Sequence, residues 1–192
     1  MSFLDVLKKK PVIAALRDVE HIPVEKLHKA GILFVLGGTI FDVPALVERA
    51  RRLNQLIFID IDLIKGVGKD HSGIRYLARE GQVDGIITTK TNLIATAKEN
   101  GLVTVQRIFV LDSESLVGGL NVVSNSKPDA VEVLPGLIVP KIIKRIRRRT
   151  SVPIIGGGLI TESSEVEEIL ASGAVGVSTT SYHLLDKTTH IL

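Results

Sequence analysis

The chain has 192 residues, of which 45% are hydrophobic and 23% are charged. This length and balance favour one globular domain over residues 1–192, with enough apolar side chains for a sizeable core. The absence of cysteine excludes disulfides and thiolate metal sites. No apolar run approaches the ~18 residues of a membrane span, and no signal peptide is recognisable, so no membrane association and a cytoplasmic location are expected. The formal net charge of +3 permits a polyanionic partner without requiring one.

Short apolar runs alternate with helix-like segments along the chain. Strands are predicted at residues 11–16, 32–36, 57–64, 85–89, 102–109, 129–135, 152–155 and 174–177. Helices are predicted at residues 24–30, 43–53, 72–79, 92–98, 113–123, 139–149 and 162–171. Near-continuous apolar strands are typical of a parallel sheet buried on both faces. This repeating order predicts a compact (β/α)8 TIM barrel, with an open α/β sheet as the alternative.

The last two predicted strands end in segments rich in glycine or in hydroxyl side chains. Such loops can bind an anion, because glycine lets the backbone approach and the N–H groups point at the ligand. In TIM barrels the loops after strands seven and eight frequently bind phosphate. The predicted phosphate-binding residues are Gly157, Gly158, Thr179 and Ser181. The alternative is a tight turn followed by helix capping, with no ligand.

Charged side chains also interrupt the apolar strands, where burial without a partner is costly. Asp60 and Asp62 are two residues apart in the predicted strand 57–64, so both are expected on one side of it. Glu132 lies between two valines of another strand. Arg107 or Lys65 could be the cation that the aspartates need. The functional interpretation is that these carboxylates bind a polyol or a metal ion at the barrel mouth, and the alternative is a purely structural ion pair with Arg107. The predicted residues around a polyol are Asp62, Arg107, Glu132, Lys65, Asp60 and Arg17.

Other signals for chemistry are weak. The segment GVG at 66–68 lacks the third glycine of a dinucleotide-binding motif, and no Walker A pattern occurs. The five histidines show no metal-ligand spacing, and only His71, beyond a strand loop, is kept as a candidate. No serine stands in a nucleophile elbow. No metal site, cofactor or catalytic residue is therefore predicted.

A basic run follows the sixth predicted strand. Its apolar stripe should pack on the barrel, so its charges should face outward. Such a face is usually just solvated, but it is also a candidate surface for RNA phosphates. The candidate RNA-binding residues are Lys141, Lys144, Arg145, Arg148 and Arg149. The same helix could instead contact another subunit, which leaves the oligomeric state open.

Five segments together resemble one family, the glycerol uptake operon antiterminators, over residues 11–185. They are DIDLIKG at 60–66, DGIITT at 84–89, VQRIFVLD at 105–112, KPDAVEVLPG at 127–136 and PIIGGGLI at 153–160. The chain departs from the family at two points. Asp60 stands where the family often has histidine, and the family's tryptophan near Leu185 is missing.

The resemblance implies a regulator that binds glycerol 3-phosphate and then acts on leader messenger RNA to permit read-through of a terminator. It implies no catalysis. One alternative is a small phosphosugar enzyme of the isomerase, aldolase or phosphodiesterase type, with Glu132 or Asp62 as the base. Another is a phosphate-ligand sensor that works through a protein partner. Binding and catalytic sites share the mouth of this fold, so the sequence leaves these alternatives open.

Overall fold

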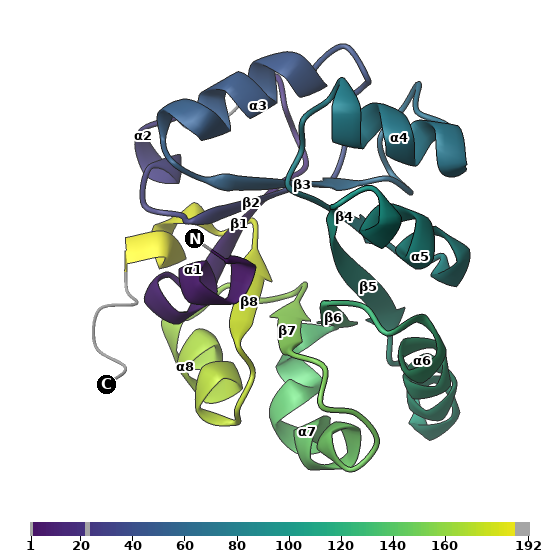
Figure 1. Cartoon of the computed structure of the whole chain (residues 1–192). Helices are drawn as coiled ribbons and strands as arrows, with labels where there is room; N and C mark the ends of the chain where they lie inside the picture. The colour runs from purple at the N-terminus through teal and green to yellow at the C-terminus, as the bar shows by residue number, and fades with distance from the viewer. Residues whose placement is uncertain (1, 22–23, 187–192) are drawn as a thin grey trace.

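A computed structural model describes residues 2–21 and 24–186 of the chain (Figure 1). Parallel strands form a closed barrel in sequence order, and β8 pairs with β1. The strands are β1 (Val12–Leu16), β2 (Ile32–Val35), β3 (Leu56–Asp60), β4 (Gly85–Thr88), β5 (Val103–Phe109), β6 (Ala130–Leu134), β7 (Ile154–Gly157) and β8 (Gly176–Thr179). The predicted TIM barrel is confirmed.

Helices surround the barrel and cover its outer face (Figure 1). They are α1 (Phe3–Lys9), α2 (Val24–Leu27), α3 (Val43–Arg52), α4 (His71–Arg79), α5 (Thr91–Glu99), α6 (Ser113–Ser126), α7 (Val139–Arg147) and α8 (Ser163–Ala171). Short 3-10 turns follow β6 and β8, at η1 (Gly136–Ile138) and η2 (Tyr182–Asp186). Local signals explain several starts: Asp70 accepts the Gly73 N–H at 2.9 Å, and Asp112 accepts the Ser115 N–H at 2.8 Å. No helix in the described part of the chain could cross a membrane.

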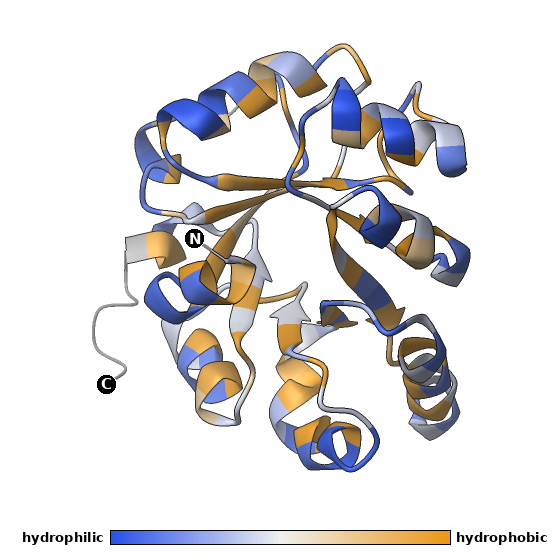
Figure 2. Ribbon diagram, viewed as in Figure 1, coloured by the Kyte–Doolittle hydropathy of each residue, from blue (hydrophilic) through white to orange (hydrophobic). Residues whose placement is uncertain are grey.

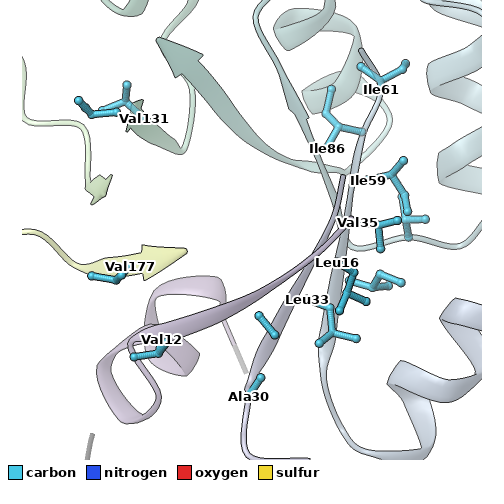
Figure 3. Packing of buried hydrophobic residues seen from close by; sticks show 14 of the residues in the cluster. Val12, Leu16, Ala30, Leu33, Val35, Ile59, Ile61, Ile86, Val131 and Val177 are labelled. Atoms are coloured by element: carbon cyan, nitrogen blue, oxygen red, sulfur yellow. The ribbon is translucent and has the colours of Figure 1, made fainter. Parts of the chain in front are cut away.

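The core has two layers because alternate residues of each strand face opposite sides. The outer layer lies between strands and helices, where Leu16, Val35 and Ile59 pack together (Figure 3). The hydropathy colouring shows the same division, with apolar strands inside and polar helix faces outside (Figure 2). The inner layer fills the barrel lumen.

Helix α1 closes the lower, N-terminal end of this lumen. Phe3 and Leu7 belong to the inner cluster, and the Phe3 ring lies 5.1 Å from that of Phe58. The helix begins at a capping box, since the Ser2 side chain accepts the Asp5 N–H at 3.2 Å. The sequence prediction did not include α1.

Several predicted boundaries were wrong. The third strand ends at Asp60 rather than at residue 64, so Asp62 lies in the following turn. The seventh strand continues into Gly156 and Gly157, which were predicted as loop. These corrections decide which side chains reach the barrel mouth.

Candidate functional site

The barrel lumen changes from apolar to charged toward its upper, C-terminal end. On each of β3, β5 and β6, an apolar residue is followed two positions later by a charged one, and this spacing keeps both side chains on the inner face. The pairs, apolar member first, are Phe58 and Asp60, Val105 and Arg107, and Ala130 and Glu132. All three charged side chains are buried. The mouth of the barrel is thus lined by charges that the fold has removed from water.

These charges form one hydrogen-bonded network. The Arg107 guanidinium donates through Nε to Glu132 Oε2 at 2.7 Å and through a terminal nitrogen to Asp60. Ser178 donates to the other Glu132 oxygen, Oε1, at 2.5 Å. Both carboxylates therefore have the cation that burial requires. The predicted pairing of an interior carboxylate with Arg107 is confirmed for Asp60.

Burial sets the protonation behaviour of this network. It raises the pKa of Asp60 to about 6; the Arg107 charge opposes this rise, while Asp62 adds to it. Burial would also lower the pKa of Arg107, but the Glu132 and Asp60 carboxylates outweigh that effect and raise it. Counted by its formal charges, the network holds one guanidinium and two carboxylates, for a net charge of −1.

Gly157 provides the room for this arrangement. A Cβ atom at this position would lie 2.6 Å from both Glu132 Oε1 and Ser178 Oγ. Any side chain here would therefore displace the hydrogen bond between these two residues. Gly157 therefore lies against Glu132 and Ser178, whereas the sequence predicted that it contacts the phosphate.

A cavity of about 340 Å³ opens above the network at the upper end of β1 and β6 to β8. Its walls combine the inner carboxylate, two cations and the loops after β7 and β8. The residues that line it include Arg17, Arg107, Glu132, Gly158, Leu159, Ser178, Thr179 and Thr180. Arg17 is exposed and has no acidic partner among the described residues.

The loop after β7 is strained where it meets this cavity. Gly158 and Leu159 have φ of 77° and 63°, so two successive residues are in the left-handed region. Glycine tolerates this conformation, but leucine is disfavoured there. Leu159 is also 72% exposed. Strain of this kind is common at ligand-binding sites.

The predicted phosphate residues are only partly brought together. Gly158 and Thr179 line the cavity, whereas Gly157 and Ser181 are not among its lining residues. The Thr179 hydroxyl donates to the Ile160 carbonyl at 2.7 Å and accepts the Ser181 N–H at 3.0 Å. Thr179 thus ties the two loops together, and its neighbours Ser178 and Thr180 also line the cavity.

Two residues predicted at the polyol lie elsewhere. The expectation that Asp62 and Asp60 share one side of a strand was wrong, because the strand ends first. The Asp62 carboxylate instead accepts the Thr89 N–H at 2.6 Å and the Thr88 hydroxyl at 3.1 Å, and it does not line the cavity. Lys65 is exposed, and its backbone pairs with Thr39 and Ile40.

The remaining candidates lie outside the mouth. A ring nitrogen of His71 lies 3.2 Å from the Thr96 hydroxyl, which links α4 to α5. No cluster of potential metal ligands occurs among the described residues. The basic residues Lys141, Lys144, Arg145, Arg148 and Arg149 are all exposed on or just after α7.

Sequence reasoning placed Ser178 in the hydroxyl-rich segment 178–181 but missed its contact with Glu132, although a signal for it existed. Gly176 pairs with Ile155, which belongs to the inner cluster, and Ser178 lies two residues further along the same strand. Ser178 therefore faces the lumen as well. A hydroxyl at that point is a natural partner for a carboxylate on a nearby strand. Leu159 had no comparable signal, because its backbone conformation depends on the turn.

The fold and the mouth together define the chain as a TIM barrel with a charged ligand-sized pocket at its C-terminal end. Residues 12–185 match the family described as glycerol-3-phosphate responsive antiterminator. The chain belongs to this family.

Comparisons with individual proteins agree. A glycerol uptake operon antiterminator regulatory protein from Listeria monocytogenes is 31% identical, with a TM-score of 0.83 over 91% of this chain and 94% of that one. A glycerol uptake operon antiterminator-related protein from Thermotoga maritima is 30% identical, with a TM-score of 0.82 over 92% of this chain and 98% of that one. The uncharacterized protein YgcP of Escherichia coli is 30% identical over 94% of both chains.

Proposed function

We propose that this protein binds glycerol 3-phosphate at the barrel mouth and, in response, binds leader RNA of a glycerol-utilisation operon to permit transcription through a terminator. The family supports the ligand and the antitermination. The observation that carries the proposal is the cavity itself, which places a buried carboxylate, a buried guanidinium and the exposed guanidinium of Arg17 within one small pocket.

Charge suggests how the ligand lies. The Asp60, Arg107 and Glu132 network has a net charge of −1, so a phosphate group is repelled from its inner end. Arg17 is exposed on the cavity wall and is not neutralised by an acid in the described part of the chain. We therefore place the phosphate near Arg17 and the loops after β7 and β8, where Gly158 and Thr180 lie. This assigns Arg17 to the phosphate rather than to the glycerol hydroxyls.

The glycerol end then points into the barrel. Glu132 and Ser178 both line the cavity and are hydrogen-bonded to one another. Glycerol hydroxyls can donate to the remaining lone pairs of the carboxylate, while Arg107 holds that carboxylate in place. Asp60 lies behind Arg107 and acts as a positioning residue.

The RNA is proposed to contact the exposed basic residues of α7. No Asp or Glu occurs between residues 133 and 161, so this surface has no acids of its own. Lysine and arginine side chains of this kind bind phosphates and make affinity strongly dependent on salt. RNA is made in the cytoplasm of bacteria, which is the proposed site of action.

A phosphosugar enzyme is the second candidate, since such enzymes use the same mouth of the barrel. It would need Glu132 as a base, yet both oxygens of Glu132 already accept hydrogen bonds from Arg107 and Ser178. The residues that line the cavity include no lysine that could form a Schiff base. These observations favour binding. Turnover of a triose or glycerol phosphate that disappears in Glu132→Gln would favour the enzyme.

Ligand binding is tested by thermal unfolding, because a ligand of the folded state raises the melting temperature. Millimolar glycerol 3-phosphate should give a clear rise, whereas glycerol and inorganic phosphate should each give less. Glu132→Gln and Arg17→Met should reduce the rise. Arg79→Met, on the outer helix α4, is the matched control. No shift with the wild-type protein would refute the proposed ligand.

RNA binding is tested separately with a leader transcript from the operon, with and without glycerol 3-phosphate. The ligand should tighten binding, and Arg145→Ala with Arg148→Ala and Arg149→Ala should weaken it and flatten its salt dependence. Tight RNA binding that ignores the ligand would remove the regulatory part of the proposal.

A further inference from the structure

A second cavity lies on the outer surface between α6 and α7, and it shares no lining residue with the cavity at the barrel mouth. It has a volume of about 240 Å³. Three aliphatic side chains of α6 form one part of it, and three arginines at the end of α7 form the other. The lining residues are Leu116, Val117, Leu120, Arg145, Arg148 and Arg149. We call this feature the α6–α7 groove.

The two sides of the groove differ in chemistry. Leu116 and Leu120 are buried, and Val117 is 39% exposed, so α6 supplies an apolar floor. The three arginines are exposed, and none has an acidic partner among the described residues. Some other surface cations are paired, for example Arg51 with Asp84 at 2.9 Å. The groove thus concentrates unpaired positive charge beside an apolar surface.

Charge selects an anionic occupant for this groove. No acidic residue follows Glu114 on α6, and none occurs on α7. A second copy of this basic face would therefore be repelled. A simple phosphate backbone would use the arginines but would leave the apolar floor against water.

The size of the groove then favours a single planar ring as its occupant. The volume of 240 Å³ lies below the ~300–1,000 Å³ of most small-molecule sites, and it is too small for a helix of an acidic protein. Nucleobases have apolar faces that pack against apolar side chains and stack on guanidinium planes. Arginine also binds phosphate through two parallel hydrogen bonds. A nucleotide combines both features in one molecule.

We propose that the α6–α7 groove binds one unpaired nucleotide of the RNA, with its base on Val117 and its neighbours and its phosphates at the three arginines. This inference rests on the proposed RNA-binding function and deepens it. It predicts that the protein recognises a single-stranded or bulged segment, whereas a purely basic helix face would bind any RNA of equal charge.

The test compares two fluorescent single-stranded oligoadenylates of equal length, one intact and one lacking its central bases. They have the same phosphates, so only base contacts differ. The wild-type protein should bind the intact strand about tenfold more tightly, in line with stacking of one base. Equal binding of the two strands would overturn the proposal.

Two variants locate the base contact. Val117→Asp places a charge on the floor, and Arg145→Lys with Arg148→Lys and Arg149→Lys keeps the charge but removes the planar groups. Each should lose the preference for the intact strand, and the lysine variant should keep the salt dependence. Arg75→Lys with Arg79→Lys, on α4, should change nothing. A preference that survives in both groove variants overturns the proposal, and melting curves verify that each variant is folded.

Competition experiments distinguish an RNA nucleotide in the groove from a free nucleotide or an acidic peptide. Adenosine monophosphate should compete only weakly, since it supplies one nucleotide without the flanking phosphates. Full competition at micromolar concentration would make the groove a site for a free nucleotide and refute the RNA contact. Equal competition by an oligoglutamate peptide would reduce the groove to a general anion-binding surface.

The outcomes also separate this inference from the proposed function. Leader binding that responds to glycerol 3-phosphate but not to either groove variant refutes the groove alone. Groove-dependent binding that ignores glycerol 3-phosphate refutes the regulatory function alone. Failure of the wild-type protein to bind any RNA refutes both.

Discussion

The lower half of the barrel lumen is filled by aliphatic and aromatic side chains, whereas the upper half holds two carboxylates and a guanidinium. The same strands build both halves, two residues apart. The lower half is closed by α1 and packs Phe3 against Phe58. The upper half opens into the cavity.

This difference assigns stability to the lower half of the lumen and the proposed binding to the upper half, although the two lie only two residues apart along each strand. Apolar packing in the lower half stabilises the fold at any pH, because it contains no titrating group. The charged upper half gains little net stability from its buried ion pairs, since their attraction mainly offsets desolvation. We therefore assign its charges to the proposed ligand site rather than to stability. The comparison can be tested by disrupting each half in turn.

Phe58→Ala disrupts the lower half and should lower the free energy of unfolding by about 3–5 kcal/mol. Phe58 is fully buried and contacts the rings of Phe3 and Phe34, with centroids at 5.1 and 5.5 Å. The loss should be equal at pH 5 and pH 7 in urea titrations. The folded variant should still respond to glycerol 3-phosphate. A loss that depends on pH would show that the two halves are not independent.

Arg107→Met disrupts the upper half and should cost about 3–5 kcal/mol at pH 7, because it leaves the Asp60 and Glu132 carboxylates buried without a cation. The loss should shrink at pH 5, where Asp60, whose pKa burial raises to about 6, takes up a proton. The variant should also lose its response to glycerol 3-phosphate. Equal losses at both pH values, measured by the same urea titrations, would contradict this account.

Asp60→Asn isolates one titration in the upper half. The pKa of Asp60 is about 6 in the folded protein, above its ordinary value of 3.8, so the folded state binds the proton more tightly. The Asp60 carboxyl should therefore contribute up to about 3 kcal/mol more stability below pH 4 than at neutral pH, and this contribution is lost as the pH rises through 6. The asparagine variant should lack this slope.

Asp112→Asn provides the control of opposite sign. Hydrogen bonds from the backbone and side chain of Ser115 lower the pKa of this exposed helix cap. Its contribution is present above the ordinary pKa and is lost as pH falls further, so its removal changes stability at neutral pH but not in strong acid. The two variants should consequently differ in the direction of their pH dependence. Matching slopes would mean that Asp60 is not the titrating group.

The sequence was sufficient for the barrel and for much of the upper network. Repeated apolar strands impose a parallel sheet, and a charge such as Glu132 between two valines must find a partner inside it. Arg107 was one of the two cations predicted as the partner of the interior aspartates, and the structure pairs it with Asp60. These inferences need only the strand pattern and the cost of burying a charge.

The remaining features depended on where strands end. Asp62 was misplaced because the apolar pattern continues through Ile61 and Ile64 after the strand itself has stopped at Asp60. The contact of Ser178 with Glu132 was overlooked because Gly157 had been interpreted as loop, so the space beside Glu132 was not apparent. Helix α1 was missed although Ser2 and Asp5 have the spacing of a capping box.

Leu159→Gly tests the strained edge of the upper half and should have the smallest effect. Leu159 has φ of 63° and is 72% exposed, so glycine relieves strain and removes little packing. The free energy of unfolding should rise by about 0.5–1 kcal/mol. Affinity for glycerol 3-phosphate should nevertheless fall a few-fold, because the leucine lines the cavity. Gln82→Gly, at φ of 50° away from the mouth, should give the gain in stability without the loss of affinity. If both variants bind the ligand like the wild type, the strain at Leu159 does not serve the site.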